Sequence, residues 1–206
     1  MKLKNLGAAA FAAASVASAM AQSSGEGPWL LRLRATQLDM ANKTTASAAA
    51  LDLNVNNKTI AEVDVSYFFN RNFAAELMLT VPQQQTVQAG ATPLGTFKHL
   101  PLTLLAQYHF TDFSGFKPYL GAGINYTKIT GVNLDGGVSL NPLALDSHSW
   151  GGALQAGVDI PLDRNWSLNF DVKKIYLRTD VYSQGVNVGT LKLDPVAASI
   201  GLGYRF

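Results

Sequence analysis

The chain has no cysteine, few charged residues and, beyond its first 21 residues, no long apolar run. The absence of cysteine excludes a disulfide framework and a thiolate metal site. Charged residues make up only 15% of the 206 residues, while glycine and aromatic residues are plentiful. No later segment approaches the roughly 20 apolar residues of a membrane-spanning helix. The length fits a single domain, whose class depends on its strand pattern.

The first 21 residues are typical of an export signal. Lys2 and Lys4 form a positive start, residues 6–20 are apolar and rich in alanine, and Ala19-Met20-Ala21 fits a cleavage site. A transmembrane helix is the alternative, but this run is short and no stop-transfer charges follow it. We therefore expect a cleaved signal peptide at 1–21 and a single domain at 22–206.

The expected mature chain has no excess of either charge. Removing Lys2 and Lys4 leaves 14 basic residues against 14 acidic ones. A nucleic-acid-binding surface needs a basic excess, so nucleic acid is not an expected partner.

The last segment, residues 196–206, alternates strictly between two kinds of side chain. Bulky apolar residues such as Ile200, Leu202 and Phe206 alternate with small or polar ones such as Gly201 and Gly203. This period of two predicts a strand with two unlike faces. A terminal strand of this kind needs a partner for its open edge, and pairing with the first strand would close a barrel.

Similar alternation recurs along the chain and predicts an all-β fold, an eight-stranded antiparallel transmembrane β-barrel with up-and-down meander topology. The phase of the seventh strand blurs after Val172, which predicts a bulge. A secreted β-sandwich is the competing fold. The strands are expected near residues 28–38, 58–68, 73–83, 100–110, 117–130, 148–160, 166–179 and 196–206, with long loops at 39–57, 84–99, 131–147 and 180–190 and short turns at 69–72, 111–116 and 161–165.

Two regularities favour the membrane barrel over the sandwich. Long and short connections alternate, as in outer-membrane barrels whose long loops are extracellular and whose short turns are periplasmic. Aromatic residues also gather on the apolar faces near the short turns, which predicts an interfacial girdle rather than the scattered depths of a sandwich core. These aromatic residues are Trp29, Tyr67, Phe73, Tyr108, Phe110, Trp166, Tyr204 and Phe206.

The opposite faces of the strands carry charge into the expected lumen. Buried charges must be paired, so we expect an ion-pair layer in the half of the barrel nearer the short turns. Neutral polar residues should extend this layer, namely Gln107, Asn125, Gln155 and Asn169. Its simplest role is structural, as a polar plug. The expected charged members are Arg32, Arg34, Glu62, Asp64, Glu76, Asp171 and Lys173.

Above this layer the inward residues become less charged. Met78, Thr80, Thr103 and Leu105 are expected to line this part of the lumen. They could line a partly apolar cavity for a small hydrophobic ligand, or they could pack against one another. The sequence leaves both possibilities open.

Six segments together resemble the OmpW family of outer-membrane proteins. The resemblance covers essentially the whole mature chain and is strongest over 99–206. The segments are HLPLTLLAQYHF (99–110), KPYLGAGINYT (117–127), SWGGALQAGVD (149–159), NWSLNFDV (165–172), LDP (193–195) and GYRF (203–206).

The resemblance implies an eight-stranded barrel that takes up small hydrophobic molecules through a narrow channel and releases them sideways into the membrane. Met78 and Lys173 match the family's lumen-facing positions near the channel base, although an apolar residue would suit the second position better. Pro82 and Pro101 cannot donate to a β-ladder and are candidates for a lateral opening. The expected partners are outer-membrane lipid, small hydrophobic ligands or detergent, and the barrel-assembly machinery, through the strand ending at Phe206.

Two other functions remain open. A structural or adhesive barrel would have a lumen packed along its full height. An outer-membrane lipid-modifying enzyme would need a serine–histidine or aspartate–histidine pair, and only His99, His109 and His148 are available. Neighbouring residues on a strand point to opposite faces, so Ser147 and His148 form a poor catalytic pair. No histidine–carboxylate spacing indicates a metal site, and no cofactor is expected.

Overall fold

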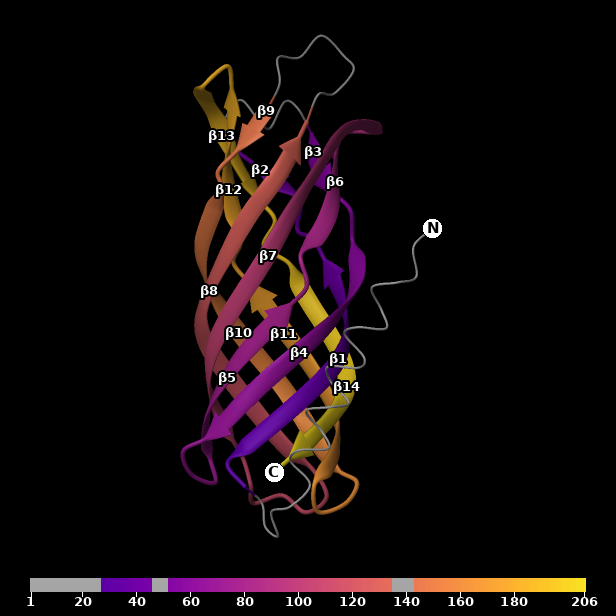
Figure 1. The fold of residues 1–206 in the computed structure, drawn as a ribbon, viewed down its shortest axis with the longest axis vertical. Helices are drawn as coiled ribbons and strands as arrows, with labels where there is room; N and C mark the ends of the chain where they lie inside the picture. The colour runs from indigo at the N-terminus through magenta and orange to yellow at the C-terminus, as the bar shows by residue number, and fades with distance from the viewer. Residues whose placement is uncertain (1–26, 46–51, 135–142) are drawn as a thin grey trace.

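The computed structural model describes residues 27–45, 52–134 and 143–206, and every regular element in these ranges is a β-strand (Figure 1). Within them no helix is long and apolar enough to cross a membrane. The expected signal peptide lies outside the described residues. The strands are β1 (Trp29–Asp39), β2 (Lys43–Thr44), β3 (Leu53–Val55), β4 (Lys58–Phe68), β5 (Phe73–Thr80), β6 (Gln83–Ala89), β7 (Thr92–His109), β8 (Lys117–Asn133), β9 (Leu143–Leu145), β10 (His148–Pro161), β11 (Trp166–Ile175), β12 (Arg178–Ser183), β13 (Val186–Lys192) and β14 (Val196–Arg205).

Eight of these strands close into an antiparallel barrel, as the alternation predicted. Going round the ring, the order is β1, β4, β5, β7, β8, β10, β11, β14 and back to β1. The first and last strands form the closing seam, which runs from Leu30 opposite Arg205 to Asp39 opposite Val196. Both strands therefore have partners on each side, so neither leaves an open edge.

The barrel wall continues beyond the ring at the end opposite the short turns, which we call the long-loop end (Figure 1). The predicted loop at 84–99 is wrong, because β6 and the long β7 pair there as a hairpin. The predicted loop at 180–190 is also wrong, because β12 and β13 form a second hairpin in a small sheet with β2 and β9. Polar and glycine-rich composition suggested loops, but pairing between neighbouring segments extends the strands.

Outward side chains of the barrel are apolar and exposed over a broad band, which includes Leu33, Leu104, Ile124, Leu154 and Ile200. Near the short turns the predicted aromatic residues contact one another across strands. Trp29 and Tyr67 have ring centroids 4.8 Å apart, and Phe73 and Tyr108 5.0 Å. Such a band with an aromatic girdle fits a lipid environment rather than water.

The interior changes character along the barrel axis. The half nearer the short turns, which we call the lower half, holds the charged side chains. The upper half, nearer the long-loop end, is filled by an apolar cluster that includes Leu38, Ile60, Phe97, Leu177 and Leu193.

This change explains the blurred phase of the seventh strand. Ile175 and Leu177 stay on the same inward face as Lys173, so the alternation continues without the predicted bulge. The inward face simply becomes apolar in the upper half. The strand itself ends at Ile175 rather than Thr179.

Candidate functional site

Two buried arginines of β1, Arg32 and Arg34, lie at the centre of the lower half of the lumen. Arg32 lies between Asp64 of β4 and Gly203 of β14 in the strand register, and Arg34 lies between Glu62 and Gly201. Because these two β14 residues are glycines, no side chains project from β14 into the lumen at these positions. The arginine side chains can therefore cross the lumen toward carboxylates on distant strands.

Arg32 is completely buried and bridges opposite sides of the barrel. Its Nη1 lies 2.6 Å from Oε2 of Glu76, and its Nη2 lies 2.6 Å from Oδ2 of Asp159. Its Nε donates to the other oxygen of Asp159 at 3.2 Å, so that pair is bidentate. Nη1 also donates to Ser66 at 3.0 Å, and the guanidinium carbon lies 5.1 Å from the centroid of the Tyr119 ring.

Arg34 and Lys173 share the next level. Nη1 of Arg34 lies 3.2 Å from Glu62 and 2.7 Å from Asp64. Nζ of Lys173 lies 2.6 Å from the same Glu62 oxygen and 2.8 Å from Asp171. We define the charge layer as the eight buried charged residues Arg32, Arg34, Glu62, Asp64, Glu76, Asp159, Asp171 and Lys173.

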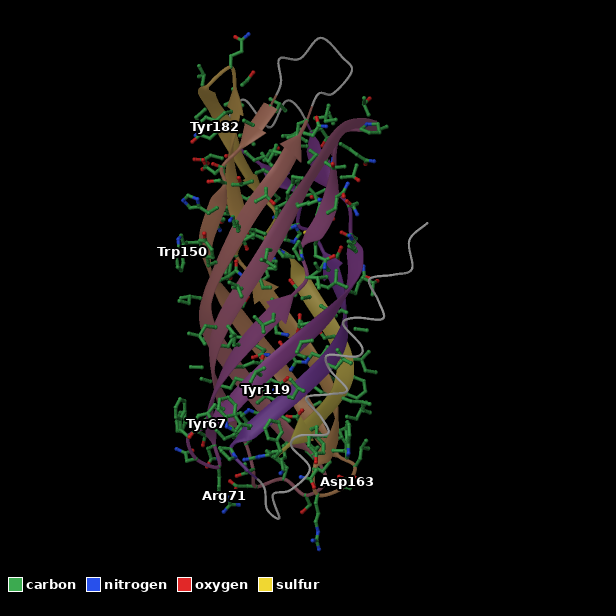
Figure 2. All side chains as sticks on the ribbon, in the orientation of Figure 1. Tyr67, Arg71, Tyr119, Trp150, Asp163 and Tyr182 are labelled. Carbon is green, nitrogen blue, oxygen red and sulfur yellow. The ribbon has the colours of Figure 1, made fainter. Side chains whose placement is uncertain are left out.

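Neutral side chains join the charged pairs into one network. Nε2 of Gln155 donates to both Glu76 and Asp171 at 2.8 Å, and Gln107 donates to Gln155 at 2.8 Å. The Tyr119 hydroxyl donates to Asp171 at 2.6 Å. Asn169 accepts a hydrogen bond from Arg34 at 2.8 Å. Figure 2 shows Tyr119 inside the barrel. The structure therefore brings together every charged residue of the predicted ion-pair layer.

Two central members of this network were missing from the prediction. Asp159 lies only two residues from the end of β10, so counting strand positions from the turn left it outside the layer. Tyr119 lies three residues inside β8 and reaches the layer because Gly157 leaves space beside its ring. The inward face of Asp159 was readable from the alternation, but its pairing with Arg32, 127 positions away, was not.

A small apolar cavity, the upper cavity, lies directly above the charge layer and has a volume of about 20 Å³. Of the predicted lining residues, Met78 and Thr80 lie on this cavity. Thr103 and Leu105 do not: Thr103 accepts a hydrogen bond from Asn125, and Leu105 packs with Met78, Ala153 and Ile175. The cavity is lined by Leu38, Ile60, Glu62, Met78, Thr80, His99, Pro101, Thr127, Ile175, Leu177, Pro195 and Ala197.

The strand pairing is interrupted beside this cavity, near the two prolines that were predicted to mark a lateral opening. The β5–β7 ladder ends where Leu79 pairs with Leu102, and the β6–β7 ladder resumes where Gln83 pairs with His99. Three residues on one strand, 80–82, thus face two on the other, 100–101. Pro82 and Pro101 lie within this interruption.

A wider interruption lies one strand away from the predicted position. The β4–β5 ladder ends where Glu62 pairs with Thr80, and the β3–β6 ladder begins where Val55 pairs with Val87. Throughout residues 52–134, all of which the structure describes, no strand pairing joins residues 57–61 to residues 81–85. We call these two segments the wall gap. A hydrogen bond of 3.0 Å from Nζ of Lys58 to the carbonyl of Gln84 crosses it.

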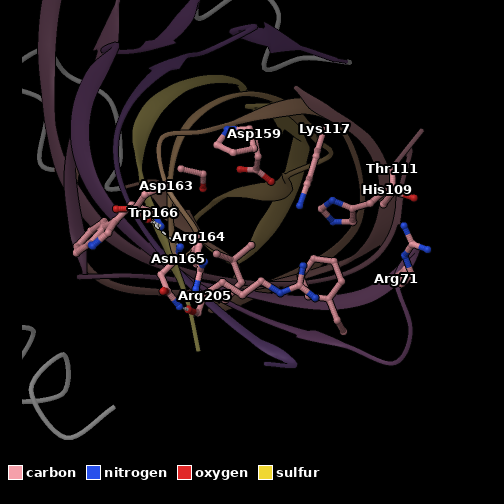
Figure 3. Close-up of a pocket in the computed structure, with 14 residues that line it drawn as sticks. Arg71, His109, Thr111, Lys117, Asp159, Asp163, Arg164, Asn165, Trp166 and Arg205 are labelled. Atoms are coloured by element: carbon pink, nitrogen blue, oxygen red, sulfur yellow. Dashed lines mark hydrogen bonds between the residues drawn. The ribbon is translucent and has the colours of Figure 1, made fainter. Parts of the chain in front are cut away.

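A second cavity, of about 60 Å³, lies on the other side of the charge layer at the short-turn end (Figure 3). Arg71, Lys117, Arg164 and Arg205 line it, and Figure 3 shows them around the barrel mouth with His109. Asp159 also lines this cavity, and Arg32 binds that carboxylate from above. The charge layer therefore separates the two cavities.

The histidines do not form a catalytic group in the described ranges. Ser147 and His148 are exposed, and Ser147 Oγ lies 2.9 Å from His148 Nδ1. Asp146 is adjacent in sequence, but no hydrogen bond joins it to His148 there. His109 is buried at the short-turn end of β7, and its ring stacks on that of Tyr119 with ring centroids 4.9 Å apart.

Comparison with known proteins identifies the relatives of this chain. A sequence profile of the OmpW family matches residues 25–206. The chain belongs to the OmpW family. It is 32% identical to outer membrane protein W of Escherichia coli K12, over 99% of this chain and 100% of that protein. It is 39% identical to the uncharacterized outer-membrane protein y4mB of Sinorhizobium fredii, over 98% of this chain and 94% of that protein.

The fold agrees with that of a solved outer-membrane protein. The crystal structure of OprG from Pseudomonas aeruginosa superposes with a TM-score of 0.72 and 25% identity, covering 88% of this chain and 97% of that one. A relative named dibenzothiophene metabolism operon protein PahQ, from Pseudomonas aeruginosa, is 28% identical over 88% of this chain and 90% of its own length. This protein is therefore an outer-membrane β-barrel of a family that is generally not enzymatic.

Proposed function

We propose that this OmpW-family barrel takes up small hydrophobic molecules across the outer membrane. The observation that carries the proposal is the position of the wall gap. It lies beside the apolar upper cavity and above a lumen that the charge layer fills. A molecule that reaches the cavity from the long-loop end meets charge below it and apolar wall at its side.

The charge layer disfavours passage straight through the barrel. A hydrophobic solute would have to displace buried ion pairs, and breaking one such pair costs about 3–5 kcal/mol. Leaving through the wall gap breaks no strand pairing between residues 57–61 and 81–85. The outward side chain beside the exit, Val81, is 59% exposed and apolar, which suits release into lipid.

The small cavity and the packed apolar cluster above it require side chains to move. About 20 Å³ holds little more than one water molecule. Met78 lines this cavity and has a flexible, unbranched side chain that can repack around a ligand. Uptake therefore involves displacement of buried side chains, Met78 among them, rather than flow through an open pore.

The relative PahQ supports the class of substrate. Its name assigns it to an operon for dibenzothiophene metabolism, and dibenzothiophene is a flat hydrophobic molecule. A related barrel in such an operon fits a role in admitting substrates of that kind.

A direct test measures uptake of naphthalene into vesicles with a lipopolysaccharide outer leaflet. We expect uptake several-fold faster with the protein than without it. Met78→Trp, which fills the upper cavity, should remove the gain. Leu77→Trp is the matched control, because Leu77 is one residue away and faces outward.

A structural barrel without transport is the second candidate, and one observation favours it. Sixteen buried hydrophobic residues of the described ranges pack together in the half of the barrel nearer the long-loop end. Uptake no faster than in protein-free vesicles would favour this structural role, as would equal rates for Met78→Trp and Leu77→Trp.

A further inference from the structure

The upper cavity contains unpartnered polar groups among its apolar walls. His99 is only 3% exposed, and its Nδ1 has no hydrogen-bond partner in the described part of the chain. The hydroxyl of Thr80 is buried and likewise unpartnered there. Both residues line the upper cavity. A buried polar group without a partner costs free energy, so two at one cavity call for a functional explanation.

The two groups lie on opposite sides of the interrupted strand pairing. Thr80 is the last residue of β5, and His99 pairs with Gln83, the first residue of β6 (Figure 1). A break in the ladder, a cavity and two unpartnered polar side chains therefore coincide. A ligand leaving through the wall gap would pass this point.

Other polar groups on the cavity are already occupied. Glu62 binds Arg34 and Lys173 within the charge layer. The hydroxyl of Thr127 donates to Asn125 at 2.8 Å. The remaining walls are apolar, with Ile60 and Ile175 among them. The unpartnered polar groups on the cavity are therefore those of His99 and Thr80, in a largely apolar enclosure.

We infer that the upper cavity selects small apolar molecules that carry one hydroxyl or carbonyl group, rather than pure hydrocarbons. This inference rests on the proposed uptake function and specifies its substrate class. A neutral imidazole has one donor and one acceptor nitrogen, and a threonine hydroxyl can do both. The hydroxyl of an alcohol or phenol can therefore bond to either residue, while its apolar body lies against the surrounding walls.

The test compares naphthalene with 1-naphthol, which differ by one hydroxyl group. Binding to the protein in lipid nanodiscs is measured by fluorescence and corrected for partition into protein-free nanodiscs. We expect the protein to prefer 1-naphthol by about threefold to tenfold, the value of one net hydrogen bond. Thr80→Val, which keeps the side-chain shape, and His99→Leu should each reduce this preference, whereas Leu77→Ala, on the outward face, should leave it unchanged.

A second readout does not depend on any substitution. The chain has only three histidines, so nitrogen-labelled histidine gives separate NMR signals for His99, His109 and His148. We expect 1-naphthol to shift the His99 ring signals and leave the other two unchanged, and naphthalene to have a much smaller effect. Equal binding of both probes, or His99 signals unchanged by 1-naphthol, would overturn the inference while leaving hydrocarbon uptake intact. Binding of neither probe would instead contradict the proposed function.

Discussion

At the scale of single residues, the charge layer shows how a narrow lumen tolerates buried charge. Arg32 makes two short ion pairs, a bond to Ser66 and a contact with the Tyr119 ring. Burying an ion is costly unless its hydrogen-bonding groups find partners. The layer nevertheless contains five carboxylates and three cationic side chains, so its members are not equally needed.

Asp159 and Asp64 are expected to differ sharply when neutralised. Asp159 binds Arg32 through both oxygens, so Asp159→Asn should lower the free energy of unfolding by about 3 kcal/mol. Asp64 lies 2.7 Å from Arg34 but accepts no hydrogen bond among the described residues. Because Asp64→Asn removes one excess negative charge, it should change stability by less than about 1 kcal/mol. Urea unfolding in lipid vesicles measures both, and a larger loss for Asp64→Asn would refute this ranking.

A turn aspartate outside the barrel gives a pH prediction. Oδ1 of Asp163 accepts from the backbone N–H groups of Trp166 at 2.7 Å and Asn165 at 2.8 Å, which holds the pKa of Asp163 below its usual 3.8. A lowered pKa in the folded state stabilises the turn above the unfolded-state pKa, and this contribution is lost as pH falls through the folded-state pKa. An NMR titration of the carboxyl carbon checks the shift. A midpoint at or above 3.8 would contradict it.

At the scale of elements, the β1–β14 seam must bring two strands together while leaving space for the arginines. A Cβ atom added at Gly201 would lie 2.1 Å from the carbonyl oxygen of Leu33 and 2.8 Å from Cγ of Arg34. The backbone contact cannot be relieved by moving a flexible side chain. Glycine at this position is therefore a condition for closing the barrel around the charge layer.

Gly201→Ala is accordingly expected to destabilise the barrel by about 2 kcal/mol through overpacking at the seam. Gly152→Ala is the matched control, because the nearest atom to its added Cβ is 3.7 Å away, an ordinary contact. Folding yield into lipid vesicles and the urea midpoint report the difference. Equal effects of the two substitutions would show that the seam has spare room.

The sequence predicted the ring of eight strands because alternation is a local signal that each strand carries by itself. It did not predict the hairpins β6–β7 and β12–β13, because residues 84–99 and 180–190 are polar or glycine-rich and lack the apolar alternation of the other strands. It predicted an ion-pair layer around Arg32 and Arg34, but not that Asp159 joins this layer by pairing with Arg32. The wall gap between residues 57–61 and 81–85 depends on where ladders begin and end, which alternation does not encode.

At the scale of the whole molecule, the barrel combines a closed lower half with an apolar upper half and an interrupted wall. The charge layer has polar contacts on several sides, including Gln155 and Asn169. It separates the upper cavity from the cavity at the short turns. A continuous water path between the two mouths is therefore not expected.

The protein in a planar lipid bilayer should accordingly show no steady potassium conductance. Neutralising both arginines, with Arg32→Gln and Arg34→Gln, removes the cations that draw the carboxylates together and should produce measurable leakage if the barrel still folds. Asp39→Asn serves as the control outside the layer. Stable channel openings in the unmodified protein would contradict a closed charge layer.

A disulfide across the wall gap tests whether hydrophobic molecules leave through it. The chain has no cysteine, so pairs can be introduced without side reactions. Continuing the register from the Val63–Leu79 pair puts Ala61 opposite Val81 across the gap. A disulfide formed by Ala61→Cys with Val81→Cys should stop naphthalene uptake, and reduction should restore it. The same bridge at Val63→Cys with Leu79→Cys, where the strands already pair, should leave uptake unchanged. Undiminished uptake with the gap bridged would contradict lateral release.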